Sequence, residues 1–351
     1  MSSSSSAARG SPADRQSKVT RWIALFGIGA LALFLTLHGL GAAGVCSYDE
    51  AIEGLFVQQM VEHGGGLFPL ANGRDAMYKP PLFHWTALAI DRLFGIRKVT
   101  PFNLRLPAAL YGTAGLLLVV WFTYTIFGGC AAPLAAMVLL GSYQYVSQAR
   151  FGRVDMTLTF CEALALTSFL SWLKARNAPD GAAAWRWLFA LALGLGVLAK
   201  GPVGAIMPLL SVAVFIAVKR DWSIAAQMFS PGSALLAIAV GSSWYAACFI
   251  GGRYDFLSRQ VGSENFGRFF GALGTMVPWY YVEPLLLNSS PLSLIAPIAV
   301  GAALTTTRHR REAAPPDTAL DAVVWLAIFW MVSVIFFTLA AYKRRSYLLP
   351  L

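Results

Sequence analysis

Residues 106–127 read LPAALYGTAGLLLVVWFTYTIF, an apolar run that contains no Asp, Glu, Lys or Arg. A helix of about 20 residues crosses the hydrocarbon core of a bilayer, and a backbone surrounded by lipid has to satisfy its own hydrogen bonds. This run therefore predicts a transmembrane helix. Eight further runs of similar character are predicted spans: 22–41, 131–149, 156–173, 185–199, 202–218, 232–250, 284–304 and 322–341.

The composition agrees with this interpretation over the whole chain. Of the 351 residues, 57% are hydrophobic and 13% are charged, whereas about 25% of the residues of a soluble domain are charged. The net charge of +10 comes from cations scattered between the spans. They form no continuous basic face, so we expect contact with the lipid bilayer and no binding of nucleic acid. The sequence predicts an all-α polytopic membrane protein.

The polar segments divide the chain. Residues 1–20, rich in Ser, Ala and Arg, predict a disordered cytoplasmic tail, and residues 21–351 a transmembrane domain of about nine spans. Residues 42–104 and 251–283 are the two long loops. The run 81–95 is short and carries three titratable side chains, so we expect it to lie at the membrane interface rather than to cross it.

That topology places the polar motifs on one side of the membrane, which we take as the outer, periplasmic side. The numbers of Lys and Arg in the loops do not distinguish the two possible orientations in the membrane. The orientation is therefore assigned from the shared location of the polar motifs. The segments expected on the outer side are 42–104, the turn at Asp155, 251–283 and 342–351.

Two adjacent carboxylates, Asp49 and Glu50, follow the first span. A carboxylate beside a membrane can act as a general base towards a hydroxyl or can orient an acceptor. Ser47 and Glu50 also match a capping box, which would give Glu50 a structural role at a helix start and leave Asp49 free. The residues alone leave both roles open.

Several cations could bind a phosphate. Lys79 precedes Pro80-Pro81, which hold the neighbouring backbone extended and rigid. The alternative to phosphate binding is a lysine that extends from a span end to the membrane interface and has no role in binding. Arg153 and Asp155 share a tight turn that suits either phosphate binding or a surface ion pair. Lys200 is interpreted as an ordinary loop lysine. The remaining candidates on the outer side are Arg268, Lys343 and Arg344.

Neither cysteines nor histidines show the spacing of a metal site. Cys46, Cys130, Cys161 and Cys248 form no Cys-x-x-Cys pair, and we expect them to be unpaired. The histidines are equally dispersed, and none is assigned as a ligand. They are His38, His63, His84 and His309.

Six motifs together resemble the GT-C membrane glycosyltransferases that use polyprenyl-phosphate sugars. The likeness is greatest to the aminoarabinose lipid A transferases and to bacterial relatives of the protein O-mannosyltransferases (family 39). The motifs are Tyr48-Asp49-Glu50, Lys79-Pro80-Pro81-Leu82 with Trp85, Ala149-Arg150-Phe151-Gly152-Arg153-Val154-Asp155-Met156, Ala199-Lys200-Gly201-Pro202, Glu264-Asn265-Phe266-Gly267-Arg268-Phe269 and Tyr347-Leu348-Leu349-Pro350.

The resemblance implies a GT-C helix bundle with interfacial helices in the first outer loop. It implies that Asp49 is the principal catalytic carboxylate, that Asp155 supports it and that Lys79 binds the donor phosphate. The aminoarabinose enzymes carry a metal-binding Glu immediately before the motif lysine, where this chain has Tyr78. No cofactor is therefore expected to be required, although a divalent metal stays open. The chain stops at Leu351, where family members continue, which implies a C-terminal truncation.

The implied function is an inverting transferase in the bacterial inner membrane, with its active site on the periplasmic face. It would move a sugar from undecaprenyl phosphate to lipid A, another glycan or a protein. The expected catalytic residues are Asp49, Glu50 and Asp155, and the expected phosphate ligands are Lys79, Arg153, Arg268, Lys343 and Arg344. Two alternatives stay open: a transporter or flippase of an anionic or polyprenyl-linked lipid, and an inactive truncated relative.

Overall fold

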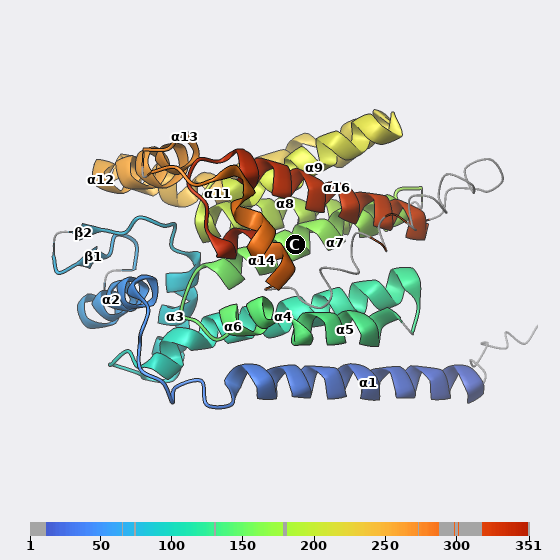
Figure 1. Cartoon of the computed structure of the whole chain (residues 1–351), viewed down its shortest axis with the longest axis horizontal. Helices are drawn as coiled ribbons and strands as arrows, with labels where there is room; N and C mark the ends of the chain where they lie inside the picture. The colour runs from blue at the N-terminus through green and yellow to red at the C-terminus, as the bar shows by residue number, and fades with distance from the viewer. Residues whose placement is uncertain are drawn as a thin grey trace, which may run out of the picture.

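The protein is a bundle of helices, several of which run roughly parallel to the long axis in Figure 1. The computed structural model describes residues 12–64, 66–73, 75–129, 131–177, 181–272, 274–287, 298, 301 and 318–349. Within these ranges five helices are long and apolar enough to cross a membrane. They are α4 (Pro101–Phe127), α7 (Asp155–Ala175), α8 (Ala182–Lys200), α11 (Pro231–Ile250) and α16 (Thr318–Leu339). The prediction of an all-α membrane bundle is confirmed.

Shorter elements complete the described chain. The other helices are α1 (Pro12–Leu37), α2 (Tyr48–His63), α3 (Leu82–Leu93), α5 (Ala131–Gly141), α6 (Tyr143–Gln148), α9 (Val203–Lys219), α10 (Ser223–Met228), α12 (Tyr254–Leu257), the π-helix η1 (Ser258–Gly267), α13 (Arg268–Phe270), η2 (Pro278–Tyr281), α14 (Val282–Leu287) and η3 (Arg345–Leu348). Two short strands, β1 (Leu70–Ala71) and β2 (Asp75–Ala76), pair antiparallel.

The structure changes two of the predicted boundaries. α1 begins at Pro12, so residues 12–20 of the predicted disordered tail are helical; Pro is tolerated in the first turn, and a helix propagates easily once its apolar part has formed. The predicted span 131–149 is divided, because Ser142 is extended and its hydroxyl caps α6 by accepting from the Tyr145 amide. Beyond Leu287 the predicted span 284–304 falls almost entirely outside the described residues.

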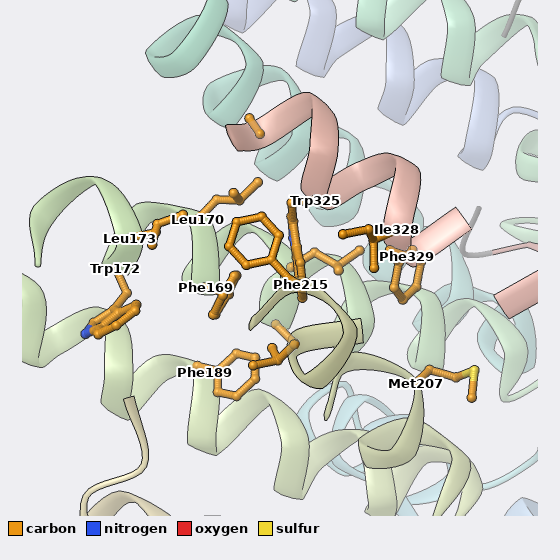
Figure 2. Packing of buried hydrophobic residues seen from close by; sticks show 14 of the residues in the cluster. Phe169, Leu170, Trp172, Leu173, Phe189, Met207, Phe215, Trp325, Ile328 and Phe329 are labelled. Atoms are coloured by element: carbon orange, nitrogen blue, oxygen red, sulfur yellow. The ribbon is translucent and has the colours of Figure 1, made fainter. Parts of the chain in front are cut away.

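An aromatic cluster holds α7, α9 and α16 together (Figure 2). The rings of Phe169 and Trp325 lie with centroids 4.3 Å apart, and Phe215 meets both rings edge-on at 5.6 and 5.7 Å. All three side chains are fully buried. Because lipid is as apolar as these rings, close packing rather than the hydrophobic effect stabilises such contacts in a membrane.

The polar motifs gather at one end of the bundle, where α2, α3, the strand pair, α12 and α13 lie (Figure 1). The segment 81–95 forms the short helix α3, as predicted; its position at the membrane interface stays a prediction. α2 begins directly after Ser47, but Ser47 makes no capping hydrogen bond. The predicted capping box is therefore not formed, because Glu50 has other partners.

Candidate functional site

Glu50 is fully buried and lies against the guanidinium of Arg105 on α4. Arg105 donates from Nε and Nη2 to the two carboxylate oxygens at 2.7 and 3.0 Å, and the Gly152 amide donates to Oε1 at 2.9 Å. A Cβ at residue 152 would collide with Leu104, so only glycine fits this close approach. These bonds tie the start of α2 to α4 and to the turn before α7.

A chain of alternating charges begins at Asp49, one residue earlier. Asp49 Oδ2 accepts from Arg153 Nη2 and from Arg344 Nη1, both at 2.7 Å. Arg153 Nε also lies 3.4 Å from Asp155 Oδ2, and Lys200 Nζ donates to Asp155 Oδ1 at 2.5 Å. The structure thus brings together four predicted site residues, from α2, the 149–154 turn, the start of α7 and the C-terminal segment, and adds Lys200.

The interpretation of Lys200 as an ordinary loop lysine is wrong. Lys200 ends α8, and its ammonium lies over the ring of Tyr347 at 4.9 Å as well as on Asp155. Gly201 follows with φ +95°, and a Cβ there would meet the side chains of Gln260 and Asn265 on η1. This glycine lets the chain turn sharply under η1 and keeps Lys200 in the charged chain.

Lys79 lies in a second buried cluster. Its Nζ donates to Glu53 Oε1 at 3.0 Å, and His84 Nε2 donates to Glu53 Oε2 at 2.7 Å. Burial raises the pKa of Glu53, but Lys79 and His84 outweigh burial and lower this pKa to about 2. Burial lowers the pKa of Lys79, while Glu53 and Asp155 raise it above its ordinary value. Lys79 is therefore held as a cation in a fixed position.

We expect the stability contribution of Glu53 to depend on pH. A folded-state pKa below the ordinary value of 4.5 stabilises the protein above pH 4.5, and this stabilisation is lost as the pH falls towards 2. The shift corresponds to roughly 3 kcal/mol. The melting temperature of the detergent-solubilised protein should fall from pH 6 to pH 3. Glu53→Gln should melt lower at pH 6 and lose less over that interval.

The control for this comparison is Glu62→Gln, on the exposed face of the same helix. It should keep the pH dependence of the wild type. An unchanged pH dependence in Glu53→Gln would show that the buried cluster does not set the acid sensitivity.

The charged chain opens into a cavity of about 350 Å³. Arg268 lies on its wall, donates to Glu264 at 2.9 Å and to the Tyr347 hydroxyl at 3.3 Å, and has its cation 5.0 Å from the Tyr342 ring. The cations among the described wall residues are Lys79, Arg153, Lys200, Arg268 and Arg344; the carboxylates are Asp155, Glu162 and Glu264. A cavity with this excess of cations suits a phosphate group.

One predicted phosphate ligand does not join the site. Lys343 is buried away from the cavity and donates to the carbonyls of Ala340 and Met276 at 2.7 and 3.4 Å. It thereby links the carbonyl just after α16 to the segment before η2, and a cation near a helix C-terminus often bonds such a carbonyl. Arg150 has a similar role, because it donates to the carbonyls of Leu35 and His38 at the end of α1.

The residues around Tyr78 do not fit a metal ion. Burial, followed by the nearby Glu53, raises the pKa of the Tyr78 phenol, so it stays protonated. Glu53 is already bound by Lys79 and His84. Over the described ranges no group of three His, Cys, Asp or Glu side chains is arranged to hold a metal. Cys46, Cys161 and Cys248 are free, and Cys130 and His309 lie outside the described residues.

The sequence is similar to known transferases over most of its length. A 26% identical relative over 329 residues is the undecaprenyl phosphate-alpha-4-amino-4-deoxy-L-arabinose arabinosyl transferase 2 of Pseudomonas fluorescens (strain Pf0-1); the match covers 93% of this chain and 56% of that protein. An uncharacterized protein of Aquifex aeolicus is 23% identical over 319 residues, covering 91% of this chain and 59% of its own. The chain thus spans a little over half the length of these curated relatives.

The fold is also that of solved transferases. The crystal structure of ArnT from Cupriavidus metallidurans bound to undecaprenyl phosphate superposes with a TM-score of 0.79 at 23% identity, covering 94% of this chain and 58% of that one. The oligosaccharyltransferase of Archaeoglobus fulgidus in its apo form superposes with a TM-score of 0.60 at 13% identity, covering 93% and 49%. These likenesses show that the helix bundle has the GT-C fold.

A protein-family model matches the chain and shows its family. The model of the dolichyl-phosphate-mannose-protein mannosyltransferases matches residues 70–250, more than half of the chain. The match runs from β1 to the end of α11 and includes Lys79, Arg153, Asp155 and Lys200. This GT-C chain therefore belongs to the dolichyl-phosphate-mannose-protein mannosyltransferase (PMT) family.

Proposed function

We propose that the protein transfers a sugar from undecaprenyl phosphate to an acceptor on the periplasmic face of a bacterial inner membrane. The observation that carries the proposal is the charged chain from Arg344 through Asp49, Arg153 and Asp155 to Lys200, on a cation-rich cavity at one end of the bundle. The names of the relatives, undecaprenyl phosphate aminoarabinose transferases, support the donor class.

The cations of the cavity would stabilise the leaving group. Transfer breaks the bond between the anomeric carbon of the sugar and the phosphate oxygen, and the lipid phosphate departs with an added negative charge. Positive groups already in place stabilise such charge without reorganisation. We assign this role to Lys79, Arg153, Arg268 and Arg344, as the sequence predicted, and add Lys200.

Asp49 is the proposed catalytic carboxylate. Two guanidiniums hold its Oδ2, while the described residues offer no hydrogen bond to Oδ1 and the side chain is 21% exposed. Oδ1 would take the proton of an acceptor hydroxyl as the hydroxyl oxygen attacks the anomeric carbon. If the acceptor is a phosphate of lipid A, Asp49 would position it instead. A single displacement inverts the anomeric centre.

Asp155 and Glu50 would act through other residues. Asp155 binds both Arg153 and Lys200, so it sets the positions of two phosphate ligands. Glu50 has all its bonds to Arg105 and Gly152. We therefore propose both as positioning residues, which for Glu50 replaces the expected catalytic role.

Transfer from a labelled donor tests the proposal. Membranes that contain the protein would be supplied with undecaprenyl phosphate carrying either labelled aminoarabinose or labelled mannose, and label would be counted separately in lipid A and in protein. We expect label in one fraction, above the level of membranes without the protein. Absence of label from both fractions, with the protein shown to be folded and inserted, would contradict a transferase.

A further inference from the structure

A carboxyl lies deeper in the cavity than the charged chain. Glu162 is on α7, two turns after Asp155, and Asp155, Leu158 and Glu162 all contribute to the cavity wall. Residues at this spacing share one face of a helix, and seven residues advance about 10 Å along its axis. Glu162 is only 2% exposed. The cavity therefore reaches from the phosphate-binding cations to a carboxyl inside a candidate membrane span.

Among the described residues of this wall, Glu162 is the carboxylate without an ion pair. Asp155 is bound by Lys200, and Glu264 is bound by Arg268. For Glu162, the described part of the chain supplies neither a hydrogen bond nor an ion pair. Lys200, the cation whose field reaches Glu162, already donates to Asp155. Most of the remaining wall is apolar and includes Leu158, Ile206, Phe269 and Phe336.

A buried carboxyl without a partner is costly, and an ionisable group that faces a cavity inside a membrane span marks a ligand site. A carboxyl oxygen of Glu162 accepts hydrogen bonds whether or not the group is ionised, so a ligand group that donates a hydrogen bond is complementary to it. An isoprenoid chain has no donor, and an ionised phosphate diester has only acceptors. The hydrogen-bond donors of a polyprenyl-phosphate sugar are the hydroxyl and amino substituents of the sugar ring.

We propose that Glu162 binds a hydrogen-bond-donating substituent of the donor sugar, either a hydroxyl or an ammonium, while the cations bind the phosphate. This inference rests on the proposed function, because it takes a glycosyl lipid phosphate as the ligand. Glu162 is then a specificity-determining residue. It distinguishes a glycosylated lipid phosphate from the bare lipid phosphate that remains after transfer.

Binding to the purified protein tests the proposal without requiring catalysis. The affinities for undecaprenyl phosphate and for undecaprenyl phosphate carrying aminoarabinose or mannose would be measured for the wild type, Glu162→Leu and Glu162→Gln. We expect the wild type to prefer at least one glycosylated lipid. Glu162→Leu should weaken the binding of that lipid by about 10- to 100-fold and leave the affinity for undecaprenyl phosphate unchanged.

Glu162→Gln identifies the group, because it keeps an acceptor oxygen but cannot become a carboxylate opposite an ammonium. If it loses affinity for the amino sugar, the ligand group is an ammonium; if it keeps the wild-type affinity while Glu162→Leu does not, the group is a hydroxyl. The control is Thr167→Val, another buried polar position of α7, whose hydroxyl bonds the Ala163 carbonyl and which is not part of the cavity wall. It should behave as the wild type.

Three results would overturn the proposal: equal wild-type affinity for bare and glycosylated lipid, an unchanged preference in Glu162→Leu, or an equal loss for both lipids in that variant. Melting temperatures would show whether Glu162→Leu fails to fold. If it does, the proposal is tested by the lipid preference of the wild type and by the affinities of the isosteric Glu162→Gln. A wild type that binds the glycosylated lipid more tightly but transfers no sugar would contradict the proposed function and leave the role of Glu162 supported.

Discussion

Replacement of Asp49 by Asn should reduce sugar transfer by about 100-fold or more, with the protein still folded and inserted. Asn has the shape of Asp, and its amide oxygen can still accept from Arg153 or Arg344, so the charged chain loses a charge but not its packing. It cannot take a proton from an acceptor, and general base catalysis contributes about 10²- to 10⁴-fold to a rate. The measurement is the initial rate of labelled-sugar transfer in membranes.

The matched control is Glu62→Gln, which removes a carboxylate from the other end of the same helix, where it is exposed and bonded only to Gln58 among the described residues. It should transfer at the wild-type rate. The Michaelis constant separates the two proposed roles of Asp49. A fall in kcat indicates a base acting on a hydroxyl, and a rise in KM for the acceptor indicates positioning. Full activity of Asp49→Asn would reject both roles.

Much of the fold could be predicted because a membrane span is a local property. The run 106–127 needs only its own composition to be recognised, and it is found within α4. Hydropathy does not reveal a helix break at which no charged residue occurs. Ser142 divides an apolar run, and its effect depends on one hydroxyl that caps α6 rather than on hydropathy.

The candidate site was predicted in part. Asp49 and Arg153 belong to two of the sequence motifs. Their contact at 2.7 Å agrees with the expectation that the polar motifs lie on one side. The partners of the motif residues were not foreseeable. Glu53 looks like one more polar residue of a helix, and only the approach of the segment around Lys79, 26 residues later, gives it a role.

Two further residues of the cavity wall have local signals in the sequence. Lys200 precedes Gly201-Pro202, a sharp turn that fixes the direction of the lysine as well as ending the helix. Glu162 is a carboxylate in the middle of the predicted span 156–173, where an ionisable side chain is rare and suggests a function. For both residues the signal lies in the immediate neighbours, whereas the cavity wall that they share comes from distant segments of the chain.

Glu50→Gln should lower the free energy of unfolding by about 3–5 kcal/mol, because it breaks a buried ion pair and leaves the Arg105 charge uncompensated. Arg105 also donates to the carbonyls of Leu40, Ala43 and Gly44, at 2.8, 2.8 and 3.0 Å. The pair therefore joins the segment after α1 to α2 and α4. Melting temperature and the yield of folded protein from membranes are the measurements.

Arg105→Met should be similarly destabilising, whereas the double variant Glu50→Gln with Arg105→Met should be less destabilised than the two single effects summed, because neither partner is then left as an unpaired charge. The same variants decide what Glu50 does in the reaction. If Glu50 only positions α2, the activity of Glu50→Gln per folded molecule should stay within about tenfold of the wild type. A loss as large as that of Asp49→Asn in protein that melts normally would restore Glu50 to the catalytic residues.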